Sequence, residues 1–137
     1  MDSNLLNSER MTAMSNGDRK RAASRFQPTG QWIRSEKRLA IYLRDSFRCV
    51  YCGKDLHSAK PADVTLDHLE PRSNGGMNHE TNLVTACHAC NCTRSDKDLA
   101  DFASKKALRK IEHLRWMDLT GYRELAVDII SKRRGSE

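Results

Sequence analysis

The sequence has 137 residues, which is enough for one domain with a modest hydrophobic core. Hydrophobic residues make up 38% and aromatic residues 6%, which predicts a thin core that needs additional stabilisation. There is no continuous apolar run of about eighteen residues, which excludes a membrane-spanning helix. The N-terminal segment over residues 1–20 is polar, so we expect no secretory signal and a cytoplasmic protein.

The formal net charge of +6 is distributed unevenly along the chain. Residues 1–48 have a net charge of +5, residues 49–98 of −2 and residues 99–137 of +3. Two basic arms around an acidic centre favour a polyanion such as a nucleic acid, held beside a cation site. Solvated basic faces of helices would give the same distribution, and this alternative stays open.

The N-terminal third predicts a tail followed by a helix. Residues 1–30 are rich in Ser, Asn, Arg and Lys, which is typical of a disordered basic tail. A helix is expected from Gln31 to Asp45, because apolar residues recur there at helical spacing. These residues are Trp32, Leu39, Tyr42 and Leu43.

The middle of the chain predicts a hairpin between two cysteine pairs. Cys49 to Gly53 is expected to form a tight turn, and Val64–Leu69 and Asn82–Ala86 two short strands that pair antiparallel. The segment that joins the strands is typical of a long loop. Its loop-forming residues are Pro71, Gly75, Gly76 and Asn78. A helix is expected to follow from Cys87 to about Ser95.

The C-terminal region predicts two scaffold helices with Gly121 as the break between them. The apolar positions of the first are Phe102, Leu108, Ile111, Leu114 and Met117, and those of the second are Tyr122, Leu125, Ile129 and Ile130. We therefore expect three parts: the tail over 1–30, a functional domain over 31–100, and a helical extension over 101–137 that packs on the same domain.

Four of the five cysteines form two CxxC pairs, Cys49–Cys52 and Cys87–Cys90. Two intervening residues let both sulfur atoms of one turn reach the same ion, and two such turns supply the four thiolates of a structural zinc site. Zinc binding would also add the stabilisation that a thin core lacks. The alternative is redox-active or free thiols. Cys92 has no partner at this spacing and is expected to be a bystander.

The segment between the cysteine pairs carries a second pattern. Asp67 and His68 are followed by Pro-x-Ser-x-Gly-Gly, then by Asn82-Leu83, and Asn91 comes directly after the second pair. Together with residues 44–53, which lead into and include the first cysteine pair, this pattern closely resembles zinc-containing HNH endonucleases over about residues 40–100. The resemblance implies an α+β fold, the ββα-metal motif, in which a helix crosses a hairpin with one divalent ion between them. Here the motif would be stapled by the four-cysteine zinc site and have flanking helices.

The resemblance also implies roles for four residues. His68 corresponds to the general base, Asp67 and Asn91 to the ligands of the divalent ion, and Asn82 to the residue that holds the hairpin loop. Asn91 stands where many members have a histidine. Because carboxylate and amide oxygens prefer hard ions, Mg²⁺ or Mn²⁺ is expected in addition to structural Zn²⁺.

The chemistry of phosphodiester hydrolysis matches these residue types. A neutral imidazole accepts a proton from water at neutral pH, and a divalent ion neutralises charge on the phosphate and the leaving oxygen. Neighbouring residues of a strand point to opposite faces. For Asp67 and His68 to act on one phosphate, either the strand must bend there or the phosphate must lie across the edge of the strand. Arg72 and Arg94 are left open between phosphate contacts and ordinary surface positions.

These patterns lead to a metal-dependent endonuclease that nicks or cuts DNA, with RNA open as a substrate. The alternative is a zinc-knuckle module that binds nucleic acid without catalysis, and a thiol redox protein is a third hypothesis. Only the first accounts for Asp67, His68, Asn82 and Asn91 occurring together. The sequence leaves open the oligomeric state, the site preference and the biological pathway.

Overall fold

The structure is a computed structural model that describes residues 33–135. From Arg34 onward the chain forms one compact unit, built around a two-stranded sheet. The elements are α4 (Ser35–Arg44), η2 (Pro61–Asp63), β1 (Val64–His68), η3 (Arg72–Asn74), η4 (Glu80–Asn82), β2 (Leu83–Cys87), α5 (His88–Arg94), α6 (Leu99–Phe102), α7 (Lys105–Leu114) and α8 (Thr120–Gly135). The expected tail over 1–30 lies outside the described residues. No helix in the described part is long and apolar enough to cross a membrane.

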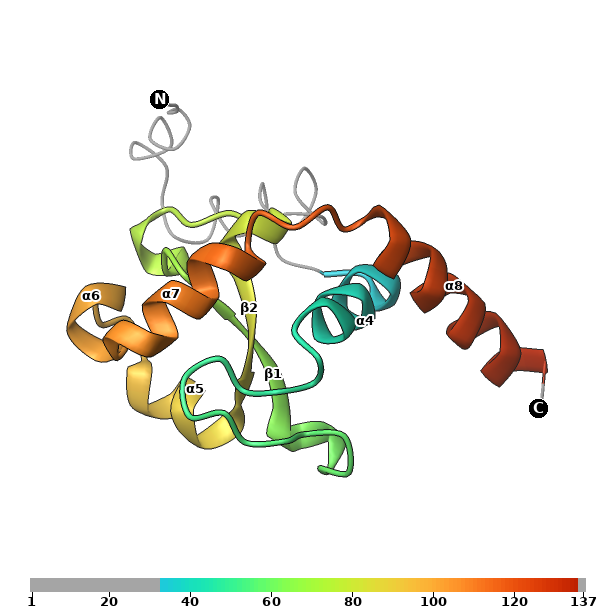
Figure 1. Cartoon of the computed structure of the whole chain (residues 1–137), viewed down its shortest axis with the longest axis horizontal. Coiled ribbons are helices and arrows are strands. Elements are labelled where there is room, and N and C mark those ends of the chain that lie inside the picture. Colours follow the sequence, from blue (N-terminus) through green and yellow to red (C-terminus); the bar gives the residue numbers. More distant parts are fainter. Residues whose placement is uncertain (1–32, 136–137) are drawn as a thin grey trace, which may run out of the picture. The chain divides into compact units, whose positions relative to one another are not determined.

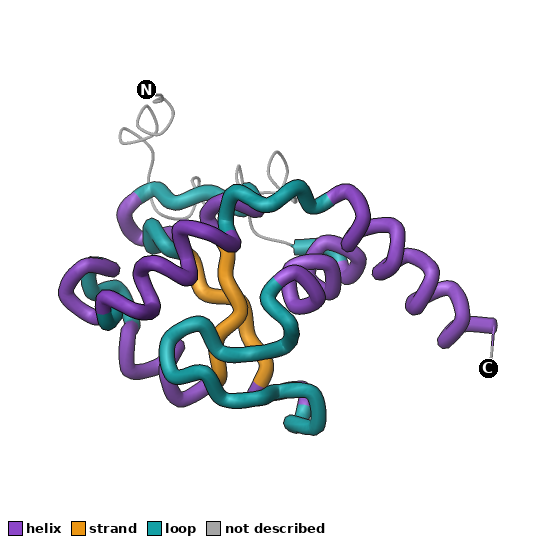
Figure 2. Tube along the Cα trace, in the orientation of Figure 1, coloured by secondary structure: helices purple, strands orange, loops and turns teal. Residues whose placement is uncertain are grey.

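The centre of the fold is an antiparallel hairpin of β1 and β2, in which Val64 pairs with Cys87 and His68 with Leu83. Every residue of β2 is buried, because helices cover the sheet on both sides. In Figure 1, α5, α6 and α7 lie on one side of the hairpin and α4 on the other. Figure 2 shows the strands crossing between these helices. The expected α+β fold with its strand, loop, strand and helix order is confirmed, with strand ends displaced by one residue.

Helix α4 begins later than the sequence predicts. Arg34 has an extended backbone, with φ −64° and ψ 152°, so the helix begins at Ser35 and not at Gln31. The predicted helical position Trp32 lies outside the described residues. The helix ends at Arg44, and positive φ angles at Ser46 and Phe47 then reverse the chain towards the first cysteine pair.

A buried ion pair ties α4 to β2. The Arg44 guanidinium contacts the Asp45 carboxylate at 2.7 Å and donates to the carbonyl oxygen of Leu83, also at 2.7 Å. The second Asp45 oxygen accepts a hydrogen bond from the backbone amide of Thr85 at 2.8 Å. Because both charges are paired and hydrogen-bonded, their burial is tolerated, and they fix the helix against the sheet.

The C-terminal helices divide at different points from those expected. The predicted helix from Phe102 to Met117 is wrong, because the Ser104 side chain accepts a hydrogen bond from Ala107 and begins α7 as its N-cap. Phe102 therefore belongs to the separate short helix α6. Gly121 lies inside the first turn of α8 and is not the break, which falls between Leu114 and Thr120.

The main core cluster joins the hairpin to α7 and to the first cysteine turn. Its buried members are Val50, Leu69, Val84, Ile111 and Leu114. A second cluster surrounds the cysteine pairs and includes Cys49, Leu56, Ala86 and Cys87. Burial of these side chains removes apolar area from water and holds the two cysteine turns beside the sheet.

Candidate functional site

The four cysteines of the two CxxC pairs form one cluster. The Sγ atoms of Cys49, Cys52, Cys87 and Cys90 all lie within 4.8 Å of one another. The Sγ atoms of Cys52 and Cys87 are 3.9 Å apart. A tetrahedral ion with Zn–S bonds of about 2.3 Å places its sulfur ligands roughly 3.8 Å apart. The cluster therefore has the donor type, number and spacing of a structural zinc site.

Local backbone geometry points the sulfur atoms inward. The amide of Cys52 donates to Cys49 Sγ at 3.5 Å, and the amide of Cys90 donates to Cys87 Sγ at 3.4 Å. The second bond also caps the N-terminus of α5, since Cys87 is its N-cap residue. One turn thus follows α4 and the other begins α5, so an ion between them would clamp the start of this helix to the first loop.

The acid–base properties of the thiols fit a cation among them. Burial alone would raise the pKa of Cys49, but backbone amides that donate to its sulfur outweigh burial and lower the pKa. Burial, followed by the neighbouring cysteines, raises the pKa of Cys90. Four thiolates at this separation repel one another, so a divalent cation is what allows all four to ionise. Cys92 stands apart and contacts His88 on the same helix.

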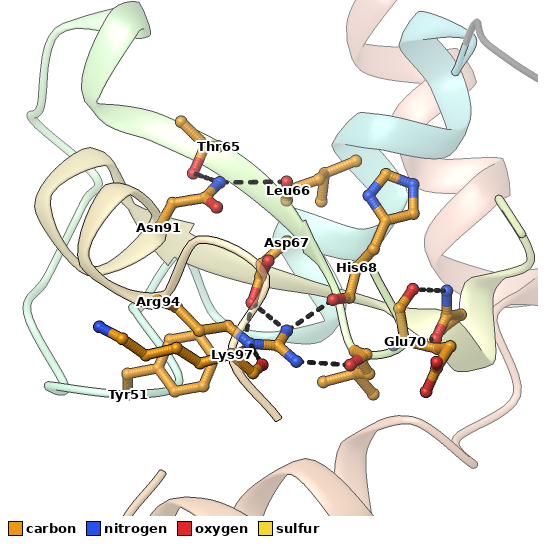
Figure 3. A network of polar contacts seen from close by, with 11 residues as sticks. Tyr51, Thr65, Leu66, Asp67, His68, Glu70, Asn91, Arg94 and Lys97 are labelled. Carbon is orange, nitrogen blue, oxygen red and sulfur yellow. Dashed lines mark hydrogen bonds and ion pairs between the residues drawn. The ribbon is translucent and has the colours of Figure 1, made fainter. Parts of the chain in front are cut away.

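Asp67 is buried near the end of β1 and is held through one carboxylate oxygen. Its Oδ2 accepts hydrogen bonds from the Tyr51 hydroxyl and from Arg94 Nη1, the latter at 2.9 Å. Burial and the charge of Asp67 raise the pKa of Tyr51, so this hydroxyl stays a donor. The contacts of Figure 3 reach only Oδ2, and the other oxygen lies on the side of the carboxylate nearer Asn91.

Arg94 is a buried structural residue and not a surface arginine. Its side chain is fully buried and donates to the carbonyl oxygens of His68 and Leu69, both at 2.6 Å. The sequence leaves Arg94 open between a phosphate contact and an ordinary surface position. Neither applies, because the guanidinium faces the end of β1. It anchors the C-terminal end of α5 to the strand that carries Asp67 and His68.

Asn91 joins α5 to the same strand. Its Nδ2 donates to Thr65 Oγ1 at 2.9 Å and to the carbonyl oxygen of Leu66 at 3.3 Å. An amide has one donor group and one acceptor oxygen, so these bonds use the nitrogen and leave Oδ1 for another ligand. The fold therefore brings Asn91 beside β1 within one or two residues of Asp67, although 24 positions separate them in the sequence. Two oxygen donors on this side of the strand fit a hard divalent ion.

His68 lies at the last position of β1, and its ring and the Asp67 carboxylate point in different directions in Figure 3. Its Nε2 is 2.7 Å from Oδ1 of Asn78 in the hairpin loop. Among the described residues, no hydrogen bond joins His68 to Asp67 or Asn91. The side chains of Asp67 and His68 thus keep the alternating directions that are expected for adjacent residues of a strand.

Asn82 spans the loop between the strands. Its Oδ1 accepts from the backbone amide of Glu70 at 2.8 Å, and its Nδ2 donates to the carbonyl oxygens of Glu70 at 3.2 Å and Met77 at 2.9 Å. Each of these side-chain hydrogen bonds goes to a backbone atom of the loop, so Asn82 holds the loop backbone in place. This arrangement holds both ends of the loop next to His68.

The structure adds three residues that the sequence analysis did not assign to the site. Tyr51 and Arg94 hold Asp67, and Asn78 contacts His68. Tyr51 lies within the first CxxC pair and Asn78 in an irregular loop, so neither periodicity nor ligand spacing identifies them. A buried arginine gives no sequence signal that distinguishes it from an exposed one.

Comparison with known proteins supports one family. The family model "HNH endonuclease" matches residues 49–114, which contain both cysteine pairs, the hairpin and α5 to α7. The CRISPR-associated endonuclease Cas9 of Corynebacterium diphtheriae is 30% identical over 90 residues, which cover 58% of this chain but 8% of that protein. No solved structure matches the chain significantly. The matched segment contains the hairpin and the four-cysteine cluster, so residues 49–114 are similar to HNH endonuclease domains, and this similarity supports a nuclease-type function.

Proposed function

We propose that this protein is a metal-dependent endonuclease that hydrolyses phosphodiester bonds of DNA. The observation that carries the proposal is the position of Asn91, a residue of α5, against β1. Its amide nitrogen is bound to Thr65 and Leu66, so its oxygen and the second oxygen of Asp67 are left as hard donors beside the strand that ends in His68.

In the proposed mechanism, each side chain has one task. His68 accepts the proton of the attacking water, a role for which a neutral imidazole is suited near neutral pH. Asp67 and Asn91 hold a divalent ion, Mg²⁺ or Mn²⁺, which when bound supplies positive charge for the phosphate and the leaving oxygen. Arg94 and Tyr51 fix the orientation of the Asp67 carboxylate through their hydrogen bonds to Oδ2.

The remaining residues maintain this arrangement. Asn82 holds the loop that follows His68, and the four cysteines hold structural Zn²⁺ that stabilises the start of α5. Separate ions for structure and for chemistry follow from the two donor sets, because thiolates select zinc and carboxylate or amide oxygens select magnesium or manganese.

A nucleic acid is the substrate that the family implies, and the charge of the chain supports it. The formal net charge is +6, and residues 49–98, where the proposed metal ligands lie, have a net charge of −2 because they contain few Lys and Arg residues. Basic regions before and after this segment would attract the phosphate backbone. We propose DNA as the substrate and treat RNA as an outcome to be tested.

One observation favours a second candidate, a module that binds nucleic acid without cutting it. Asp67 is paired with the buried guanidinium of Arg94, which also places a positive charge next to the proposed ion site. If this charge prevents the ion from binding, the same fold would only bind nucleic acid.

The decisive experiment is cleavage of supercoiled plasmid by the full-length protein with Mg²⁺, with Mn²⁺ and without added divalent ion. Omission of the ion is preferable to a chelator, which would also remove zinc. We expect ion-dependent nicking that His68→Ala abolishes and His113→Ala, an exposed histidine on α7, leaves unchanged. Binding without cleavage by the wild-type protein under all conditions would establish the second candidate instead. Single-stranded and duplex RNA in the same assay decide the substrate class.

A further inference from the structure

The imidazole of His68 has a partner in the hairpin loop. Its Nε2 lies 2.7 Å from Oδ1 of Asn78, and the same oxygen receives a hydrogen bond from Arg72 Nη1 at 3.3 Å. His68 is partly buried, so this contact restricts the imidazole more than the same contact would on a fully exposed side chain. Asn78 does not belong to the motif that resembles HNH endonucleases.

The contact that Asn78 shares with Arg72 decides which ring nitrogen of His68 carries the proton. A guanidinium only donates, so the amide atom that faces Arg72 must be the oxygen of Asn78. An amide oxygen only accepts, so Nε2 of His68 must donate to it. In a neutral imidazole with its proton on Nε2, the other nitrogen, Nδ1, is the acceptor.

The loop that carries Asn78 is itself held in place. Lys37 Nζ, on α4, donates to the carbonyl oxygen of Asn78, and Asn82 Nδ2 donates to the preceding carbonyl of Met77. A Cβ atom on Gly76 would lie 1.7 Å from the carbonyl oxygen of Glu70, so the loop backbone packs closely there. Asn78 is therefore presented to His68 by contacts from both α4 and the residue that precedes β2.

We propose that Asn78 is a positioning residue for His68. It holds the imidazole in the tautomer with the proton on Nε2, and so keeps Nδ1 as the atom that accepts the proton of water. Lys37 lies on α4, outside the segment that matches the family, and its hydrogen bond to Asn78 means that α4 also helps to position the imidazole. The inference rests on the proposed role of His68 as general base.

The first test compares two substitutions of Asn78 in the full-length protein. Asn78→Leu keeps the approximate size but removes the acceptor, and should lower kcat about 10- to 100-fold, as loss of a partner that orients a histidine does. KM should change little, because substrate contacts are retained. Asn78→Asp restores an acceptor oxygen and should recover kcat to within several-fold of wild type. Asn74→Leu, an exposed position in the same loop, is the matched control.

The second test observes the tautomer directly. In protein labelled with ¹⁵N at histidine, the wild type should show His68 with a protonated Nε2 and an unprotonated Nδ1. The Asn78→Leu variant should show a mixture of both tautomers while zinc content and helical content stay unchanged. Lys37→Met should lower kcat in the same direction but less than Asn78→Leu.

Two outcomes would overturn the inference: a wild-type His68 with its proton on Nδ1, or an Asn78→Leu variant with wild-type kcat. Failure of the proposed function is recognised separately. If His68→Ala cuts DNA at the wild-type rate, His68 is not the base. If His68→Ala is inactive but Asn78→Leu is fully active, only the positioning role is wrong.

Discussion

Arg94 Nη1 donates to Asp67 Oδ2 at 2.9 Å, and this ion pair joins the last residue of α5 to the buried position of β1. The Arg94 side chain is completely buried, and its other hydrogen bonds go to backbone carbonyl oxygens around the end of β1 and after α5. Helix and hairpin are thus connected by charge at the point where the proposed chemistry takes place. The orientation of Asp67 depends on the stability of this connection.

Substitution of Arg94 should therefore destabilise the fold. Arg94→Met keeps the length of the side chain but leaves a buried carboxylate without its charged partner and three carbonyl oxygens without their donor. Breaking a buried pair from one side costs about 3–5 kcal/mol. We expect a loss of this size in the free energy of unfolding, measured by urea denaturation with zinc present.

The control for this measurement is Arg109→Met on the exposed face of α7, which should change stability by less than about 0.5 kcal/mol. The double variant Asp67→Asn with Arg94→Met should lose less than the sum of the two single variants, because the buried charge is removed along with its partner. An Arg94→Met variant as stable as wild type would contradict the structural role assigned to this residue.

Zinc content provides an independent prediction. Cys87 is a buried member of the thiol cluster and the N-cap of α5, so Cys87→Ser should abolish stoichiometric zinc binding and loosen the helix. Cys92→Ser changes an exposed thiol outside the cluster and should retain about one zinc per chain. Metal analysis and circular dichroism of both purified variants distinguish these results. A folded, active Cys87→Ser protein without zinc would contradict the clamp.

The sequence predicted the hairpin, α5 and the grouping of four cysteines because each has a local signal. Alternation of apolar residues marks the strands, and the CxxC spacing marks the turns. The hairpin pairing of Val64 with Cys87 then places the second cysteine turn at the end of the sheet, beside the first. These features could be predicted because pattern and tertiary structure agree.

Other features depend on tertiary contacts that leave no periodic signal. The burial of Arg94 follows from carbonyl oxygens presented by β1, and the partnership of Asn78 with His68 follows from loop geometry. The apolar pattern does not reveal the boundary at Ser104, because the N-cap is defined by one side-chain hydrogen bond with Ala107. The roles of Asp67, His68, Asn82 and Asn91 stay predictions until variants are assayed.

Two threonines on the sheet should respond differently to loss of the hydroxyl. Thr85 Oγ1 is buried and has no hydrogen-bond partner among the described residues, so Thr85→Val removes an unsatisfied polar atom. We expect the free energy of unfolding to stay constant or rise by about 1 kcal/mol. The backbone bond from Thr85 to Asp45 does not involve the hydroxyl and is retained.

Thr65 is the matched comparison, because its hydroxyl donates to the carbonyl of Ala86 at 2.7 Å and accepts from Asn91 at 2.9 Å. Thr65→Val should lower stability by about 1–3 kcal/mol and also raise the Mg²⁺ concentration that cleavage requires, since Asn91 loses an orienting partner. Equal effects of the two valine substitutions on urea midpoints would argue against these hydrogen-bond assignments.

Glycine substitutions test how closely the hairpin loop is packed. A Cβ atom at Gly76 would overlap the backbone of Glu70, with 1.7 Å to its carbonyl oxygen, so Gly76→Ala must displace the loop. We expect reduced stability and a loss of cleavage larger than stability alone explains, because Asn78 and Asn82 are both attached to this loop. Gly121→Ala is the control: apart from its neighbours and the backbone of its own helix, no atom lies within 4 Å of its Cβ position, and alanine favours the helical state by up to about 1 kcal/mol. Wild-type activity in Gly76→Ala, measured at saturating Mg²⁺, would show that loop position does not limit the reaction.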